Sequence, residues 1–524
     1  MLKRLLVLAL VLGVASVAGA DTFVRGDGSG SDTLNTGTGW GDAYATIQKA
    51  IDSLNLGIDV NTAVTETICI QASSGGQFYA PSGRSGSFQN PTELTFKGGY
   101  ENVDVAPVQS GVSLITGSGL GGSDIGLNLN KTSGDHGEYV KMHVESFDIL
   151  DVSIGTRIKA ATGYDSVRPA ITLDNCDVEA GTYGVQIDWA KTYMHGPSVI
   201  TLTGSSVSAG KSGAGDGVYS NGPMNKVTIE AGSAVTSASG HGVHVETTAA
   251  SDGTSPANAY FVKVSDSSVS NCSGDGVHWE DQRTLPYRRE YALIELDKAT
   301  IANNGGDGVF GLTHCNGDWT GGNNTGEMHL LAENSLIAGN GGNGVYLEGV
   351  TDGRTDCSQV ELALLNCTIA DNALDGVHTL TDHYTGGPHV IRNTILSGNG
   401  GDGLDVADGN GTGMTVSEEY NGFFANAGTD LLVNGSGVAL DLNDLIASPA
   451  FIGSGANMYR LGPSSLLLDA ANPAYAPADD LYGALRPIGL GPDIGALEGT
   501  IVPEPAGLSL LGLALLGLRR RKRA

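Results

Sequence analysis

The sequence predicts an all-β solenoid in which short strands stack as a parallel β-helix, with one coil per repeat. Three observations carry this prediction. A glycine–valine motif recurs about every thirty residues, and a second apolar element lies upstream of each copy. The composition, with 79 glycines and only 6% aromatic residues, is typical of turn-rich β structure.

The first element of the repeat is a turn that ends in glycine followed by valine or leucine. "SGDGVHWE" at 273–280 is one copy, and "GGNGVYL" begins another at position 341. Because Asp-Gly and Asn-Gly pairs favour turns with positive φ, we expect this glycine to adopt a positive φ and the next residue to face the interior. The turn glycines are Gly184, Gly217, Gly242, Gly276, Gly308, Gly344, Gly376 and Gly403.

The second element is a short strand whose apolar residue precedes the turn glycine by seven positions in five of the eight copies. A propeller blade needs four strands in about 40 to 50 residues, whereas these repeats have room for three short strands and a loop. The spacing therefore favours a β-helix over a propeller. The apolar residues that we expect to point inward are Val178, Val207, Val235, Val269, Ile301, Ile337, Ile369 and Ile395.

This pattern resembles the right-handed parallel β-helix family, which includes pectate lyases and many surface proteins. The string "GWGDAYATIQKAID" at 39–52 resembles the entry to such domains. That resemblance implies an amphipathic capping helix whose inward residues are Ala43, Ile47, Ala50 and Ile51. It also implies a cap with the first coils over 21–100 and β-helix repeats over 101–440.

The segment that follows, from "SPAFIGSGANMYRLG" at 448 to "DIGALEG" near 499, resembles the terminal region of bacterial surface β-helix proteins. The expected division therefore ends with a β-rich segment over 441–499 and a tail over 500–524.

The N-terminus has the features of a secretory signal peptide over 1–20. Lys3 and Arg4 precede an apolar run from Leu5 to Val17, and Ala18-Gly19-Ala20 forms an A-x-A cleavage site. We expect the leader to be removed after Ala20 and the protein to be exported.

The C-terminal tail combines Pro503-Glu504-Pro505 with an apolar stretch over 506–518 and a cluster of five basic residues over 519–523. A helix of thirteen residues rises about 20 Å against a hydrocarbon core of about 30 Å, so it is a marginal, transient membrane helix. The tail closely resembles the PEP-CTERM sorting signal. That resemblance implies an exosortase-type enzyme as a partner, and a location at the cell surface or outside the cell.

The formal net charge is −29. Such a surface repels nucleic acid, anionic lipid and polyuronates unless divalent cations intervene. We expect no nucleic-acid partner and no obligatory cofactor, with Ca²⁺ in the acidic turns left open.

If each valine after the turn points inward, the next residue points outward and aligns with its equivalents on neighbouring coils. This outward column supplies candidate ligand-binding residues, because a sugar ring could lie on its aromatic members. They are Tyr219, His244, His278, Phe310, Tyr346 and His378.

His244, Glu246, His278 and Glu280 are expected to form a square on two adjacent coils. This square suits a divalent metal or a general acid/base pair, and the two glutamates could serve a retaining glycosidase if their oxygens lie about 5 Å apart. The alternative is that like side chains stack only for stability, as scaffold residues at repeat positions usually do.

Polygalacturonase-like hydrolases of this fold carry Gly-His-Gly and Arg-Ile-Lys strings, which also occur here at 240–242 and 157–159. Their order is reversed relative to that family and its aspartate signatures are missing, so we treat the match as accidental. His241 stands in the slot that aspartate fills in other repeats.

Two of the six cysteines, Cys176 and Cys367, occupy a small-residue slot and are expected to be buried and unpaired. Cys315 and Cys357 lie in loops after consecutive turns and could form a disulfide outside the cell. Cys69 and Cys272 remain unassigned.

The sequence as a whole favours an exported surface or matrix protein with a non-catalytic display or adhesion role, and an extracellular glycan or polysaccharide as its ligand. The alternatives are a polysaccharide lyase or glycoside hydrolase, and a purely structural spacer.

Overall fold

The computed structural model describes residues 21–499, with gaps at 27–28, 55–63, 73–84, 89–91, 105–106, 118, 120–122, 132–138, 161–167, 190–196, 223–224, 248–259, 282–289, 316–325, 352–357, 382–386, 410–413 and 454–457. The predicted signal peptide and the sorting tail therefore lie outside the described residues.

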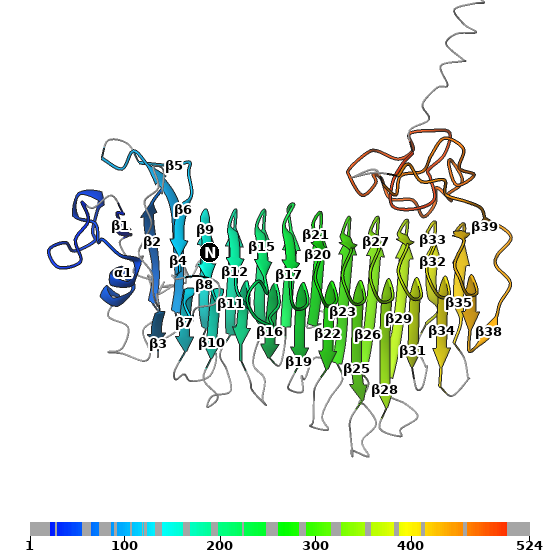
Figure 1. Ribbon diagram of the computed structural model, residues 1–524, viewed down its shortest axis with the longest axis horizontal. Coiled ribbons are helices and arrows are strands. Elements are labelled where there is room, and N and C mark those ends of the chain that lie inside the picture. Colours follow the sequence, from blue (N-terminus) through cyan, green and yellow to red (C-terminus); the bar gives the residue numbers. More distant parts are fainter. Residues whose placement is uncertain are drawn as a thin grey trace, which may run out of the picture.

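The chain winds into a parallel β-helix with three sheets, which confirms the predicted architecture (Figure 1). Each strand pairs in parallel with its equivalent on the next coil, so neighbours in a sheet are roughly thirty residues apart in sequence. We call the sheets A, B and C in the order in which a coil visits them.

Sheet A contains β1 (Thr22–Val24), β2 (Val64–Gln71), β4 (Thr92–Glu101), β8 (Tyr139–Glu145), β11 (Arg168–Asp174), β14 (Ser198–Thr203), β17 (Asn225–Glu230), β20 (Tyr260–Ser265), β23 (Glu290–Asp297), β26 (Gly326–Glu333), β29 (Ser358–Leu365), β32 (His389–Arg392) and β35 (Val416–Glu419), with β5 (Val108–Gln109) antiparallel to β4.

Sheet B contains β6 (Ser113–Thr116), β9 (Phe147–Val152), β12 (Asp177–Ala180), β15 (Ser206–Ala209), β18 (Ala234–Ser237), β21 (Ser268–Ser270), β24 (Thr300–Ala302), β27 (Leu336–Ala338), β30 (Thr368–Ala370), β33 (Ile395–Ser397), β36 (Gly422–Phe424) and β39 (Leu445–Ile446).

Sheet C contains β3 (Ser85–Phe88), β7 (Ile125–Lys131), β10 (Ile154–Ala160), β13 (Val185–Asp188), β16 (Val218–Gly222), β19 (Val243–Thr247), β22 (Val277–Asp281), β25 (Val309–Cys315), β28 (Val345–Thr351), β31 (Val377–Thr381), β34 (Leu404–Asp408), β37 (Leu431–Val433) and β38 (Ser436–Gly437).

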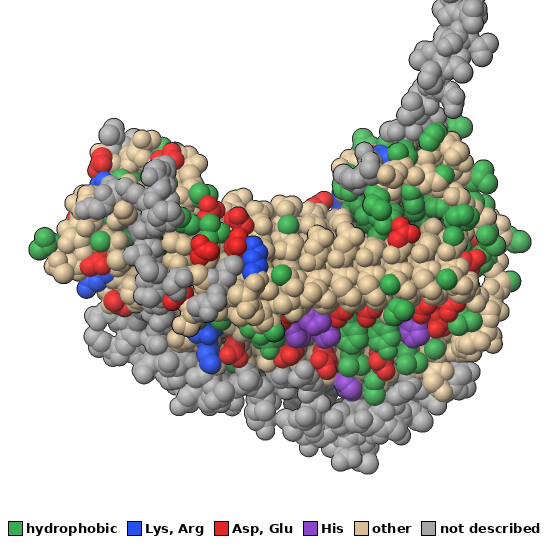
Figure 2. All heavy atoms as spheres, in the orientation of Figure 1, with side chains coloured by type: hydrophobic (Ala, Val, Ile, Leu, Met, Phe, Trp, Pro, Cys, Tyr) green, Lys and Arg blue, Asp and Glu red, His purple; other side chains and the backbone are tan. Residues whose placement is uncertain are grey.

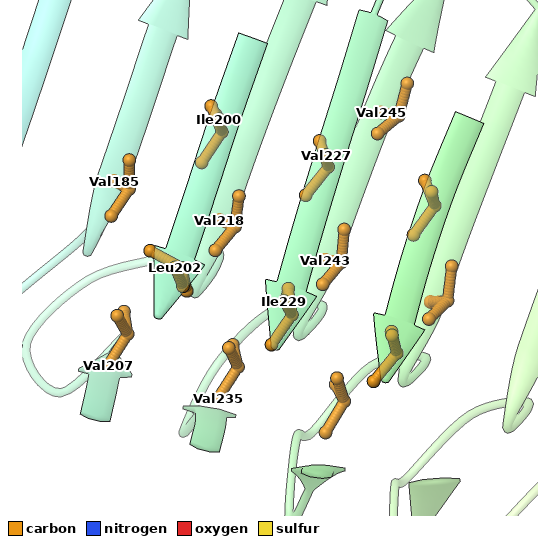
Figure 3. Packing of buried hydrophobic residues seen from close by; sticks show 14 of the residues in the cluster. Val185, Ile200, Leu202, Val207, Val218, Val227, Ile229, Val235, Val243 and Val245 are labelled. Carbon is orange, nitrogen blue, oxygen red and sulfur yellow. The ribbon is translucent and has the colours of Figure 1, made fainter. Parts of the chain in front are cut away.

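The core is built from columns of small apolar side chains that point into the space between the sheets (Figure 3). The residue after each turn glycine, from Val185 to Leu404, is fully buried as predicted. The upstream column is also confirmed from Val178 to Ile369, but Ile395 is a correction. Leu396 is the residue that pairs with Ile369, so Ile395 points out of the coil and packs under the C-terminal segment.

The turn glycines are required for a different reason from the one we expected. None of the eight predicted turn glycines has positive φ. Instead, a Cβ on Gly308 would lie 2.5 Å from the carbonyl oxygen of Gly344, and the other turn glycines approach the next coil as closely. Because backbone cannot yield as a flexible side chain does, only glycine fits. The positive φ values occur in other turns, for example at Asn334 and Asn366 between sheets A and B.

The aspartate before the turn glycine bonds to the next coil. Asp275 Oδ1 accepts the backbone N–H of Asp307 at 2.6 Å, and Asp375 Oδ1 accepts that of Asp402 at the same distance. His241 stands in this series, as the sequence indicated: its own N–H is accepted by Asp216, and its Nδ1 accepts the N–H of Asp275 at 3.0 Å. One carboxylate oxygen of each of these aspartates therefore stabilises the stacking of neighbouring coils.

A buried asparagine ladder, which we did not predict, crosses five coils beside the core. Each side-chain amide donates to the carbonyl oxygen of the next, at 2.9 to 3.0 Å. The same oxygens accept backbone N–H groups, starting from that of Cys272. These uncharged polar groups thus satisfy one another inside the coil turns. The ladder consists of Asn304, Asn340, Asn372, Asn399 and Asn426.

The N-terminal end is covered by η1 (Trp40–Asp42) and α1 (Ile47–Ser53) (Figure 1). Thr46 caps α1, because its Oγ1 accepts the N–H of Lys49 at 3.1 Å. The predicted inward residues of this cap are all buried. Within the described part of the chain, no helix is long and apolar enough to span a bilayer.

The C-terminal segment, residues 441–499, folds back over the outer face of sheet B at β27, β30 and β33 (Figure 1). We expected this segment to be β-rich. Its described residues instead form turns, with β39 and the isolated bridges Phe451–Leu461 and Asp479–Leu485 as their β structure. Side chains that face outward from sheet B supply its core, so the segment does not need sheet pairing of its own.

Four cysteines are buried as free thiols, and the two predicted packing residues Cys176 and Cys367 are among them. Burial raises the pKa of Cys272 and of Cys367 to about 12, so both remain unreactive thiols. Cys69 is the fourth. The proposed Cys315–Cys357 disulfide lies outside the described residues, because Cys357 and the side chain of Cys315 are not described.

Candidate functional site

The outer face of sheet C carries the candidate residues in the register that the repeats predicted. His244 pairs with His278, and Glu246 pairs with Glu280, on the adjacent strands β19 and β22. Further along the sheet, Phe310 pairs with Tyr346 and Tyr346 with His378. We call this outer surface of sheet C, from β13 to β34, the sheet C strip. Figure 2 shows histidine side chains gathered beside acidic side chains on part of the described surface.

From His278 to His378 the rings of the sheet C strip stack on one another along the axis of the solenoid, whereas Tyr219, His244 and His278 meet edge to face. His278 and Phe310 have centroids 4.5 Å apart with planes at 9°, and Tyr346 and His378 have centroids 5.3 Å apart with planes at 2°. In the stacked part of the strip the ring faces therefore lie against neighbouring rings. That a sugar ring lies on these aromatics stays a prediction.

Carboxylates bind both tyrosine hydroxyls of the strip. Tyr219 Oη donates to Glu246 Oε2 at 2.7 Å, and Asn221 Nδ2 donates to the same oxygen at 3.1 Å. Tyr346 Oη donates to Glu348 Oε2 at 2.9 Å. Burial together with the hydrogen-bonded carboxylate raises the pKa of both tyrosines, so the hydroxyls stay protonated and can donate.

The predicted square of two histidines and two glutamates is present, but loose. His244 Nε2 lies 3.6 Å from Glu246 Oε1, and His278 Nε2 lies 3.8 Å from Glu280 Oε2. The tighter partners are aspartates: His244 Nδ1 lies 2.8 Å from Asp216, and His278 Nδ1 lies 2.7 Å from Asp275. Each histidine therefore has a carboxylate near each ring nitrogen.

Sequence reasoning missed three residues of this site, namely Asp216, Asp275 and His241. The signal for Asp275 was present, because the string Asp-Gly-Val-His places it three residues before His278. Asp216 contacts His244 from the neighbouring coil, so no local string indicated that pair. His241 was noticed only as an irregular member of the aspartate slot. Its ring centroid lies 4.2 Å from that of His278 and 4.9 Å from that of His244.

Asp275 is the most strongly perturbed acid of the group. Burial would raise its pKa, but hydrogen bonds with His241 and His278 outweigh burial and hold the pKa of Asp275 well below the ordinary value. The carboxylate stays charged at every physiological pH.

His378 forms a second, separate pair of contacts at β31. Its Nδ1 lies 3.1 Å from Asp375 and 3.1 Å from Asp405, and these bonds raise the pKa of His378 to about 9. Because the folded-state pKa lies above the unfolded value of about 6.5, the pair stabilises the fold fully below pH 6.5, and this contribution is lost as the pH rises through about 9.

An NMR titration of the His378 ring should therefore show a pKa close to 9, and Asp405→Asn should lower it. The free energy of unfolding should fall by about 3 kcal/mol between pH 6.5 and 9.5, and His378→Gln should remove this dependence. Asp441→Asn, in an exposed turn, is the control. A His378 ring that titrates near 6.5 in the native chain contradicts the assignment.

A hollow of about 270 Å³ lies on sheet A, away from the sheet C strip. Its lining includes Asp297, Leu331 and Glu333, and burial raises the pKa of both acids. None of the predicted site residues contributes to it.

Residues 250–421 match the family described as "Right handed beta helix region". Together with the observed coils, this match identifies the fold as a right-handed parallel β-helix. No protein of curated function shows significant sequence similarity to the chain.

Three solved structures illustrate what the fold is similar to. The A-module of the mannuronan C-5 epimerase AlgE4 from Azotobacter vinelandii aligns with a TM-score of 0.40 and 15% identity, covering 79% of this chain and 98% of the module. Pectate lyase Pel9A aligns with a TM-score of 0.37 and 13% identity over 92% and 97%. Tailspike protein 3 of bacteriophage CBA120 aligns with a TM-score of 0.33 and 12% identity over 79% and 60%.

Proposed function

We propose that this protein is an exported β-helix of the bacterial surface or extracellular matrix that binds a polysaccharide along the sheet C strip. The leader and tail features of the sequence support export. The continuous array of hydroxyl, carboxylate and ring-edge groups on consecutive coils supports a ligand that is itself a repeating polymer.

The array is the observation that carries the proposal. Eight strands from β13 to β34 span about 34 Å at the spacing of paired strands, which is the length of several sugar units. A polymer lying along the solenoid axis would meet the Tyr219–Glu246 pair at one point and the Tyr346–Glu348 pair further along. Paired carboxylates and hydroxyls accept and donate hydrogen bonds to sugar hydroxyls.

Charge selects the class of polysaccharide. The chain carries a formal net charge of −29, and the strip itself presents Glu246, Glu280, Glu348 and Asp405. An anionic polymer would be repelled unless cations bridge it, so the ligand is a neutral, hydroxyl-rich polysaccharide.

Affinity electrophoresis of the full chain through gels that contain neutral or uronic-acid polysaccharides tests the proposal. We expect retardation by a neutral polymer, and an affinity about tenfold lower for Glu280→Gln and for Tyr346→Phe, because each loses one hydrogen bond to a charged or polar partner. Tyr291→Phe on sheet A is the matched control. Unchanged binding in both strip variants would refute the site.

The same incubations should be checked for released oligosaccharide. Release that disappears in Glu280→Gln would favour the alternative of a lyase or hydrolase over a binding protein.

A further inference from the structure

The five residues Asp216, His241, His244, Asp275 and His278 form a compact group, which we call the histidine cluster. Their ligand atoms fall into two sets, each within 4.8 Å, and both sets contain His241. The first set adds Asp216 and His244, and the second adds Asp275 and His278. Three imidazoles and two carboxylates thus lie close together across three coils, in two sets that overlap at His241.

His241 is the residue that makes this group unusual. In most neighbouring coils the same slot holds a carboxylate or amide whose oxygen accepts a backbone N–H of the next coil, as Asp275 and Asp307 do. The imidazole keeps that function through Nδ1, which accepts the N–H of Asp275. His241 Nδ1 also lies 3.3 Å from the Asp275 carboxylate. If Nδ1 takes the ring proton and donates it to this carboxylate, the lone pair of Nε2 becomes available to a cation.

The other two histidines are each flanked by carboxylates at both ring nitrogens, with aspartate near Nδ1 and glutamate near Nε2. Whichever nitrogen binds a cation, the opposite N–H therefore has a carboxylate to hold it. This is the arrangement by which carboxylates orient metal-binding histidines. In addition, the buried Nε2 of His244 makes no hydrogen bond.

We propose that the histidine cluster binds one divalent transition-metal cation. His241 is the ligand that the two sets have in common. The remaining ligands come from His244, His278, Asp216 and Asp275. Imidazole with carboxylate suits Zn²⁺, Ni²⁺ and Cu²⁺, whereas Ca²⁺ and Mg²⁺ prefer oxygen alone. Since the two sets share His241, they take one cation and not two.

The site does not depend on polysaccharide binding. The buried position of the His244 and His278 side chains, which are 15% and 14% exposed, limits the cation to protein ligands and few waters.

Isothermal titration of the full, metal-stripped chain with Zn²⁺ tests the proposal without any polysaccharide present. We expect one equivalent with a Kd of about 1 µM or tighter, and a Tm that rises with Zn²⁺ concentration. Co²⁺ in place of Zn²⁺ should give the visible absorption of a nitrogen- and oxygen-ligated ion.

His241→Asp is the decisive variant. It restores the residue type that other coils use in this slot, so the acceptor for the N–H of Asp275 is retained and the fold should be unaffected. We expect the Zn²⁺ affinity to fall at least tenfold. His329→Gln on sheet A is the matched control, because His329 also lies between two carboxylates, Glu327 and Glu361, but belongs to none of the sets of possible metal ligands among the described residues.

Three results would overturn the site. They are a wild-type chain that takes up no Zn²⁺, a His241→Asp chain that binds as the wild type does, and a loss of binding in His329→Gln that equals the loss in His241→Asp.

Discussion

Asn340→Leu is expected to lower the free energy of unfolding by about 4 kcal/mol. Asn340 is the second member of the asparagine ladder and is 1% exposed. Its Oδ1 accepts both the backbone N–H and the side-chain amide of Asn304, and its Nδ2 donates to Asn372. Leucine fills the same space but leaves these buried groups without partners, and each orphaned group costs about 1 to 3 kcal/mol.

The midpoint of urea unfolding reports the loss, and hydrogen exchange should show it concentrated in the coils that contain β24, β27 and β30. Asn303→Gly is the control, because Asn303 is exposed, has a φ of 57° that glycine adopts freely, and lies next to the ladder. We expect a change of less than about 1 kcal/mol for the control. An equal loss of unfolding free energy in the two variants would show that the hydrogen bonds of the ladder do not stabilise the fold.

Arg486→Met should be about as destabilising, by about 4 kcal/mol, and its effect should be confined to the C-terminal segment. Arg486 and Glu498 form an ion pair at 2.6 Å, and their side chains are 1% and 0% exposed. The guanidinium also donates to the carbonyl oxygen of Gly495 and to Asn334 Oδ1. Methionine would leave the Glu498 carboxylate buried and uncompensated.

Limited proteolysis should then release the C-terminal segment from the full chain while the coils stay resistant. The double variant Arg486→Met with Glu498→Leu should recover much of the loss, because the buried charge is removed with its partner. The exposed pair Lys141–Glu93, at 2.9 Å, gives the control: Lys141→Met should cost less than about 1 kcal/mol. A C-terminal segment that resists protease in Arg486→Met would contradict this account.

The fold could be predicted from the sequence because each residue type of the repeat is required by the local structure of its own coil. The residue after each turn glycine is valine or leucine in all eight copies and is fully buried. The eighth upstream residue was wrong by one position, although the seven-residue spacing to Gly403 already favoured Leu396 over Ile395. Ile395 is apolar for another reason, since it contacts the C-terminal segment.

The parts that could not be predicted depend on contacts between coils or between distant segments. The asparagine four residues before the turn glycine is visible in the sequence, but its function requires knowing that Asn304 lies over Asn340. The turn glycine was located correctly and explained wrongly, because a close approach between coils and a positive φ both require glycine. Sequence likewise placed His241 in the aspartate slot but did not bring it against His244 and His278.

The C-terminal segment illustrates the same limit over a longer range. Arg486 donates a hydrogen bond to Asn334, which lies about 150 residues earlier in the chain, and no local sequence pattern indicates such a contact.

The two ends of the coil stack are finished in different ways. A solenoid of parallel strands has open edges whose unpaired N–H and C=O groups could template another copy. At the first end α1 packs against β1, β2 and β3, while at the other end sheet C finishes in an antiparallel hairpin with β38, whose two residues are exposed. A strand so short offers almost no template. At this edge of sheet C, pairing with another copy is therefore disfavoured.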